Sequence, residues 1–129
     1  MTDVNQMNPI RVLIVDDHAI LRIGLGIALA SVDDMELIGE AENGSQAVEL
    51  CKDLLPDVVL MDLRMPVMDG VEATSRIVEQ FPDIRVIVLT SGMGEETQDD
   101  ALHAGACAYL QKSVSVQSLT HTIREAVAA

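Results

Sequence analysis

Residues 10–30 read I-R-V-L-I-V-D-D-H-A-I-L-R-I-G-L-G-I-A-L-A. The first six form a short run rich in β-branched side chains, which is typical of a strand buried in a parallel sheet, and two aspartates, Asp16 and Asp17, follow it. Between Ala19 and Ala30, one set of residues recurs at every third or fourth position and so lies on one face of a helix: Leu21, Gly24, Leu25, Ala28 and Leu29. This stretch therefore predicts a buried strand, an acidic turn and a helix, the repeating unit of an α/β protein.

The same order of strand and helix recurs four more times along the chain. We expect further strands at 35–42, 58–61, 85–89 and 108–110. The helices after them are expected from the Asn43-Gly44-Ser45 turn to Pro56, with Leu55 on the apolar face, and at 70–80, 95–104 and 115–127. Five such units in 129 residues predict one domain with a doubly wound parallel sheet and helices on both faces.

The composition excludes several classes of function. With 8 Lys+Arg against 21 Asp+Glu the net charge is −13, which repels phosphate backbones, so this segment is not expected to bind nucleic acid. The longest nearly apolar run, residues 20–30, is about half of the ~20 residues that a membrane span needs, so no membrane attachment is expected. Residues 1–9 are polar and are expected to form a flexible tail. The two cysteines, Cys51 and Cys107, are too few for a disulfide framework and suggest a reducing cytoplasm.

Polar side chains mark the ends of four expected strands. They are Asp16 and Asp17 after the first strand, Asp62 after the third, Thr90 after the fourth and Lys112 after the fifth. Taken singly, an aspartate at a strand end is usually a helix cap or a turn residue. Together they point to a ligand site, because parallel α/β sheets bind ligands at the carboxyl ends of their strands.

The chemistry of this set indicates a cation and a phosphoryl group. Two carboxylates about 4 Å apart repel by up to ~4 kcal/mol at an effective dielectric of 20, so three of them require a cation. Oxygen ligands favour Mg²⁺, with Mn²⁺ or Ca²⁺ as substitutes, and Mg²⁺ shares its shell readily with phosphate oxygens. A carboxylate can attack phosphorus itself, while Lys112 and Thr90 bind the other phosphoryl oxygens.

Four motifs in order resemble the receiver domain of two-component response regulators, over about residues 10–127. They are V-D-D-H at 15–18, V-V-L-M-D-L-R-M-P-V-M-D-G at 58–70, V-I-V-L-T-S at 86–91 and A-G-A-C-A-Y-L-Q-K at 104–112. The resemblance implies a flavodoxin-like (βα)₅ fold with strand order 2-1-3-4-5. It also implies that a sensor histidine kinase phosphorylates the domain, which switches an output and is not an enzyme beyond its own Mg²⁺-dependent phosphorylation and dephosphorylation.

The same resemblance assigns a role to each site residue. Asp62 matches the phosphoacceptor and Lys112 the phosphate-binding lysine. Thr90 matches the switch hydroxyl and Tyr109 the switch aromatic residue. The Mg²⁺ ligands it implies are Asp16, Asp17, Asp62 and the backbone carbonyl of Arg64. The chain departs from many receivers at Ser113, where they carry a proline, and at Ser91, where they carry alanine.

Finer details are similar to the subgroup with a C-terminal LuxR-type helix-turn-helix (NarL/FixJ-like). These details are L-R-I-G-L at 21–25 after D-D-H, and G-E-A-E-N-G at 39–44. We therefore expect residues 10–129 to be the receiver, with transcription as the output through a DNA-binding domain absent from this chain. The alternative is a stand-alone receiver that acts as a phosphorelay shuttle or a protein-binding module.

Two other functions are possible for such a fold. A phosphatase with an aspartate nucleophile usually needs a second acid two residues after the nucleophile, where this chain has Arg64. A nucleotide or flavin binder needs a glycine-rich loop after the first strand, where Asp16 and Asp17 would repel a phosphate.

The first helix carries two apolar stripes. Because the stripe that contains Leu21 and Leu25 is expected to face the sheet, Ile20, Ile23 and Ile27 should be exposed, which indicates a homodimer or kinase-docking surface. The alternative is that the last helix covers them.

We expect His18 to serve at the helix start rather than as a metal ligand, and Asp33, Asp34, His103 and His121 to be solvated.

Overall fold

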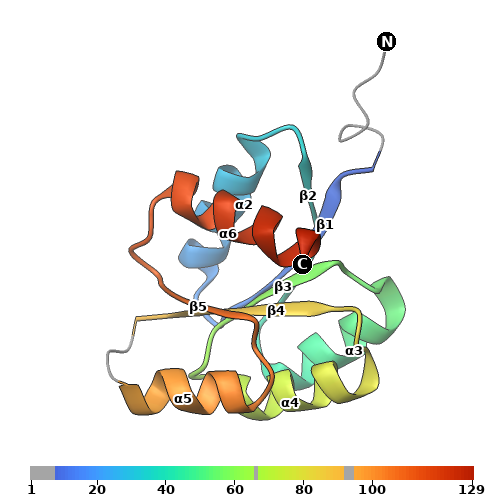
Figure 1. The fold of residues 1–129 in the computed structure, drawn as a ribbon, viewed down its shortest axis with the longest axis vertical. Helices are drawn as coiled ribbons and strands as arrows, with labels where there is room; N and C mark the ends of the chain where they lie inside the picture. The colour runs from blue at the N-terminus through green and yellow to red at the C-terminus, as the bar shows by residue number, and fades with distance from the viewer. Residues whose placement is uncertain (1–7, 66, 92–94) are drawn as a thin grey trace.

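The computed structural model describes residues 8–65, 67–91 and 95–129. Of the tail expected over residues 1–9, positions 1–7 lie outside the described residues. Five strands and five helices alternate along the rest of the chain (Figure 1). The strands are β1 (Ile10–Val15), β2 (Met35–Ala41), β3 (Val58–Met61), β4 (Arg85–Thr90) and β5 (Ala108–Gln111). The helices are α2 (Ala19–Ala30), α3 (Gly44–Leu54), α4 (Gly70–Gln80), α5 (Glu95–His103) and α6 (Val116–Ala128). Every predicted element is present, and its ends agree with the expected ones to within two residues.

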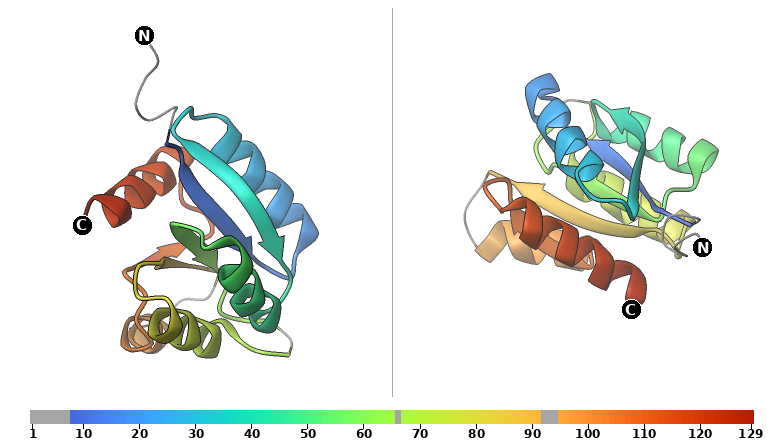
Figure 2. Two further views of the ribbon diagram at one scale, coloured as in Figure 1. Left: turned by 90° about the vertical axis from the view of Figure 1, so that its right-hand side faces the viewer. Right: turned by 90° about the horizontal axis from the view of Figure 1, so that it is seen from above.

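The strands form one sheet in the order β2-β1-β3-β4-β5, and all neighbouring pairs are parallel, as predicted. Figure 1 shows α2 and α6 on one face of the sheet and α3, α4 and α5 on the other, and Figure 2 shows the strands between these layers. Strand β1 is the switch point, because β2 pairs on one side of it and β3 on the other. Alternate strand residues feed two separate apolar clusters, one under each helix layer.

Side chains cap three of the helices. Asn43, Asp69 and Ser115 accept hydrogen bonds from backbone N–H groups in the first turns of α3, α4 and α6. These bonds satisfy donors that have no partner inside a helix, which explains why each helix begins where it does.

The expectation that Leu55 lies on the apolar face of α3 was wrong. The helix ends at Leu54, and Leu55 adopts a left-handed conformation with φ 49° that leaves its side chain 56% exposed. The following Pro56 disfavours a helical conformation in the residue before it, so Leu55 leaves the helix and turns outward.

The expectation that Asp34 is solvated was also wrong. Its carboxylate accepts bonds of 2.6 and 2.9 Å from the Arg124 guanidinium on α6. The hydrogen bond to Arg124 holds the pKa of Asp34 below its usual value. This ion pair connects the turn before β2 to α6.

No helix within the described ranges is long and apolar enough to span a bilayer.

Candidate functional site

Two aspartates meet at the centre of the sheet edge, where β1 and β3 end. The backbone N–H of Asp16 donates to the Ala41 carbonyl on β2, and that of Asp62 donates to the Val15 carbonyl on β1. These bonds continue the strand ladders by one residue, so both side chains leave the sheet at the same edge. Asp16 is only 2% exposed and Asp62 only 4%, whereas Asp17 lies at the open side of the cluster.

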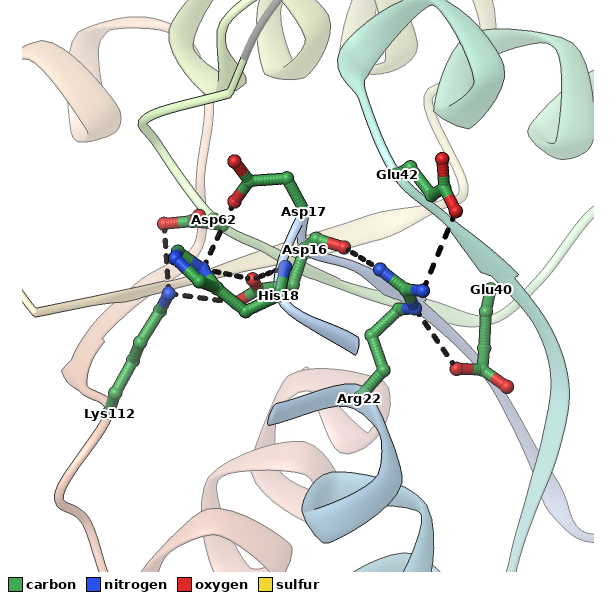
Figure 3. A network of polar contacts seen from close by, with 8 residues as sticks. All are labelled: Asp16, Asp17, His18, Arg22, Glu40, Glu42, Asp62 and Lys112. Carbon is green, nitrogen blue, oxygen red and sulfur yellow. Dashed lines mark hydrogen bonds and ion pairs between the residues drawn. The ribbon is translucent and has the colours of Figure 1, made fainter. Parts of the chain in front are cut away.

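Lys112 joins these two carboxylates. Its Nζ lies 2.8 Å from Oδ2 of Asp16 and 3.3 Å from Oδ1 of Asp62 (Figure 3). Its backbone N–H donates to the Thr90 carbonyl, which extends the pairing of β4 with β5 to the edge of the site. Sequence analysis placed these residues together correctly, because parallel strands of similar length end on one line.

Asp16, Asp62 and Lys112 change one another's pKa values. Burial raises the pKa of Asp62 above its usual value and the nearby Asp16 carboxylate raises it further, although Lys112 and a backbone hydrogen bond from Arg64 act in the opposite direction. Burial by itself lowers the pKa of Lys112, but the carboxylates of Asp16 and Asp62 outweigh that effect and raise it. The ammonium therefore stays charged beside two desolvated acids.

His18 lies closer to the acidic cluster than the sequence analysis expected. It is the N-cap residue of α2, as predicted, but its side chain makes no capping bond. Instead its Nδ1 lies 3.0 Å from Oδ1 of Asp16 and 3.1 Å from Oδ1 of Asp17 (Figure 3). Sequence spacing gave no sign of this, because the side-chain direction depends on how the turn leaves β1.

Arg22 is a site residue that the sequence analysis missed. From α2 its guanidinium donates to the Asp16 carbonyl oxygen at 2.5 Å and lies 3.3 Å from a carboxylate oxygen of Glu40 (Figure 3). It also lies 3.6 Å from Glu42. The Arg22 side chain is only 13% exposed, so it binds the turn after β1 instead of extending into solvent. The available signal was a single arginine inside an otherwise apolar helix.

The loop after Asp62 is fixed by a close backbone approach. The N–H of Gly70 donates to the Leu63 carbonyl at 2.8 Å, and a Cβ at Gly70 would overlap the Asp62 carbonyl oxygen. Glycine is thus required where α4 begins beside the acceptor strand. Arg64 in this loop has an exposed side chain.

The two expected switch residues lie on neighbouring strands. Thr90 is 2% exposed at the end of β4, and Tyr109 faces Val88 in the register between β4 and β5. The Tyr109 ring packs against the apolar cluster under α3, α4 and α5, while its hydroxyl is buried without a hydrogen-bond partner among the described residues.

A model of the response regulator receiver domain matches residues 12–124. The chain belongs to this family. The transcriptional regulatory protein LiaR of Bacillus subtilis is similar to it, 44% identical over 117 residues that cover 91% of this chain and 56% of LiaR. Among solved structures, the signal receiver domain of NarL from Mycobacterium tuberculosis is 30% identical with a TM-score of 0.91, over 95% of this chain and 98% of that one.

A LuxR-family response regulator from Aurantimonas sp. SI85-9A1 also matches, with 30% identity, a TM-score of 0.88, and coverage of 94% of this chain and 86% of that chain. These relatives confirm the receiver fold and its NarL/LuxR-like subgroup. The receiver spans about half the length of the curated relatives it matches, 56% in the case of LiaR. Receivers are signalling modules rather than enzymes with a separate substrate.

The donors of this receiver fit a hard divalent cation. One donor atom from each of Asp16, Asp17, His18 and Asp62 lies within 4.8 Å of the others. Buried carboxylates that face each other gain from a cation, and oxygen ligands suit Mg²⁺. The acidic cluster is thus compatible with the metal that the family implies.

Proposed function

We propose that this receiver accepts a phosphoryl group on Asp62 from a phosphohistidine of a sensor histidine kinase. The observation that carries the proposal is the position of the Lys112 ammonium, partly shielded from solvent, between the carboxylates of Asp16 and Asp62. When negative charge passes from the Asp62 carboxylate to a phosphoryl oxygen, the Lys112 ammonium can move to that oxygen and remain within the site.

In the transfer, a carboxylate oxygen of Asp62 attacks phosphorus and forms an O–P bond. The bond from phosphorus to the donor imidazole nitrogen breaks, and that nitrogen leaves with the electron pair and takes a proton from solvent. Lys112 then binds one oxygen of the acyl phosphate and the Thr90 hydroxyl binds another. No general base is needed, because the ion pair with Lys112 favours the carboxylate form of Asp62 and acts against the effect of burial.

The residues that would hold Mg²⁺ are Asp16, Asp17, Asp62 and the backbone carbonyl of Arg64, with Mn²⁺ or Ca²⁺ as possible substitutes. When bound, the ion offsets the negative charge that the carboxylates and phosphoryl oxygens bring together. Arg22 keeps Asp16 in place from α2 through its bond to the Asp16 carbonyl.

The signal would leave the site through Thr90 and Tyr109. Movement of the Thr90 hydroxyl toward the phosphoryl group frees space beside β4, and the Tyr109 ring on the adjacent strand responds. A change at the edge of the sheet thus reaches the surface near α5.

We assign residues 10–129 to the receiver and propose transcription as its output, through a C-terminal DNA-binding domain. LiaR is named a transcriptional regulatory protein, and a LuxR-family relative from Staphylococcus aureus is named a DNA-binding response regulator, which supports this proposal. The free cysteines, Cys51 and Cys107, fit a cytoplasmic setting. A stand-alone receiver that acts as a shuttle or protein-binding module is the alternative.

The outer face of α2 supports a homodimer as part of this function. Ile20, Ile23 and Ile27 are 85%, 62% and 68% exposed, so α6 does not cover them and the predicted exposure is confirmed. An exposed apolar stripe on one helix is typical of a partner surface. We propose that a second copy of the chain covers it after phosphorylation.

The acceptor can be tested by mass spectrometry of the receiver treated with acetyl phosphate and Mg²⁺. One labile phosphate is expected on the native protein and on an Asp83→Asn control, which alters an exposed turn residue. It should be lost in Asp62→Asn. Labelling that persists in Asp62→Asn would place the acceptor elsewhere.

A further inference from the structure

We propose that His18 is a metal ligand that shifts the selectivity of this site toward first-row transition ions such as Co²⁺ and Zn²⁺. The inference rests on the metal site in the proposed function and adds a nitrogen donor to its oxygen donors. The Mg²⁺ ligands in the proposed function are Asp16, Asp17, Asp62 and the backbone carbonyl of Arg64, without His18.

The distances around the imidazole fit neighbouring ligand positions on one ion. Metal–ligand bonds of about 2.1 Å place adjacent donors on an octahedral ion roughly 3.0 Å apart. Nδ1 of His18 lies 3.0 Å from Oδ1 of Asp16 and 3.1 Å from Oδ1 of Asp17. One donor atom from each of His18, Asp16, Asp17 and Asp62 lies within 4.8 Å of the others.

The backbone places the imidazole in this position. The N–H of His18 donates to Oδ1 of Asp16 at 2.8 Å, and the carbonyl of His18 accepts from the N–H of Arg22 in the first turn of α2. The Arg22 guanidinium in turn binds the Asp16 carbonyl. Because the His18 side chain is 65% exposed, an ion can reach Nδ1 from solvent without displacing core residues.

The chemistry of imidazole gives the direction of the preference. Carboxylate sites without nitrogen suit Mg²⁺, whereas imidazole binds Zn²⁺, Ni²⁺ and Cu²⁺ well and Mg²⁺ poorly. A neutral His18 therefore adds affinity for transition ions while it leaves Mg²⁺ binding to the oxygens. The competing interpretation is that His18 acts only through the 3.0 Å contact of its Nδ1 with Oδ1 of Asp16, as a hydrogen bond or an ion pair. In that case, removal of His18 would affect Mg²⁺, Co²⁺ and Zn²⁺ alike, because the contact acts on the carboxylates and not on the ion.

The test measures dissociation constants of Mg²⁺, Co²⁺ and Zn²⁺ by calorimetry on metal-free protein, with the visible absorption of bound Co²⁺ as a second readout. The variant is His18→Asn, and the matched controls are His103→Asn on α5 and His121→Asn on α6, both exposed. The second control also removes the surface pair of His121 with Glu125, which could bind Zn²⁺ by itself.

We expect His18→Asn to weaken Co²⁺ and Zn²⁺ by about tenfold or more, at least the loss seen when an outer-shell partner is removed, and to leave Mg²⁺ within about twofold. The Co²⁺ spectrum should change only in this variant. Unchanged affinities in His18→Asn, an equal change for all three ions, or the same loss in His103→Asn would overturn the proposal. If the native receiver bound none of the ions, the metal site of the proposed function would fail as well.

Discussion

The Lys112 ammonium lies 2.8 Å from a carboxylate oxygen of Asp16 and 3.3 Å from one of Asp62, so it is closer to the aspartate that is not the proposed acceptor. Both carboxyl groups are nearly inaccessible to solvent. The lysine therefore stabilises the unphosphorylated site as a shared counter-ion, and phosphorylation of Asp62 would draw it toward the new charge. Stability and signalling consequently depend on the same side chain.

Replacement of Lys112 should destabilise the metal-free receiver. Lys112→Met leaves Asp16 and Asp62 without their cation, and breaking a buried ion pair on one side costs about 3 kcal/mol. Urea unfolding in the presence of a chelator measures the free energy of unfolding. Lys52→Met, on the exposed side of α3, is the control and should change it by less than ~0.5 kcal/mol. Equal losses in the two variants would show that Lys112 does not act as the counter-ion.

Mg²⁺ should stabilise the receiver through Asp17 and Asp62. At about 100 times its dissociation constant the ion should add ~2.7 kcal/mol, because it binds only the folded chain. Asp17→Asn should be more stable than the native protein without metal, since one repelling charge is gone, and should lose the response to Mg²⁺. Melting curves with and without Mg²⁺ measure both effects, with Asp53→Asn on α3 as the control. A melting temperature of the native protein that is the same with and without Mg²⁺ would refute this prediction.

The pair of Asp34 and Arg124 should make stability depend on pH in acid. Because the pKa of Asp34 is lowered in the folded state, its contribution is fully present above the ordinary value of 3.8 and is lost as the pH falls through the lower folded pKa. Arg124→Met should reduce the free energy of unfolding by ~0.5–1 kcal/mol at pH 7, since the pair is partly exposed.

This difference should shrink when urea unfolding is repeated at successively lower pH below 3.8. Arg76→Met removes an exposed pair with Glu72 within α4 and serves as the control. A difference between native protein and Arg124→Met that stays constant down to the lowest pH would mean that Asp34 is not the group responsible.

The isoleucine stripe on α2 should contribute to association rather than to folding. Because Ile23 is 62% exposed, Ile23→Asp should shift the melting temperature by no more than about 2 °C. It should weaken dimerisation of the phosphorylated receiver by roughly tenfold or more in analytical ultracentrifugation. Leu102→Asp, on the exposed side of α5, should leave the dimer intact. Unfolding by Ile23→Asp would mark the stripe as core, and loss of transfer from the kinase without loss of dimer would assign the surface to the kinase.

The sequence by itself determined the order of strands and helices, the parallel sheet and the convergence of Asp16, Asp62 and Lys112. Local signals set these features: the apolar period distinguishes strand from helix, and parallel strands that end on polar residues must present them at one edge. The exposure of Ile20, Ile23 and Ile27 followed from the same periodicity.

Only the tertiary structure decided how the side chains pair across the fold. Sequence spacing does not show that His18 turns over the acidic pair, that Arg22 binds the Asp16 carbonyl, or that Asp34 meets Arg124, which is 90 residues away. Nor does it show that Val67 adopts a left-handed backbone with φ 71°. These contacts depend on turn geometry and on the distance between packed elements, and small changes in either redirect a side chain without changing the hydrophobic pattern that specifies the fold.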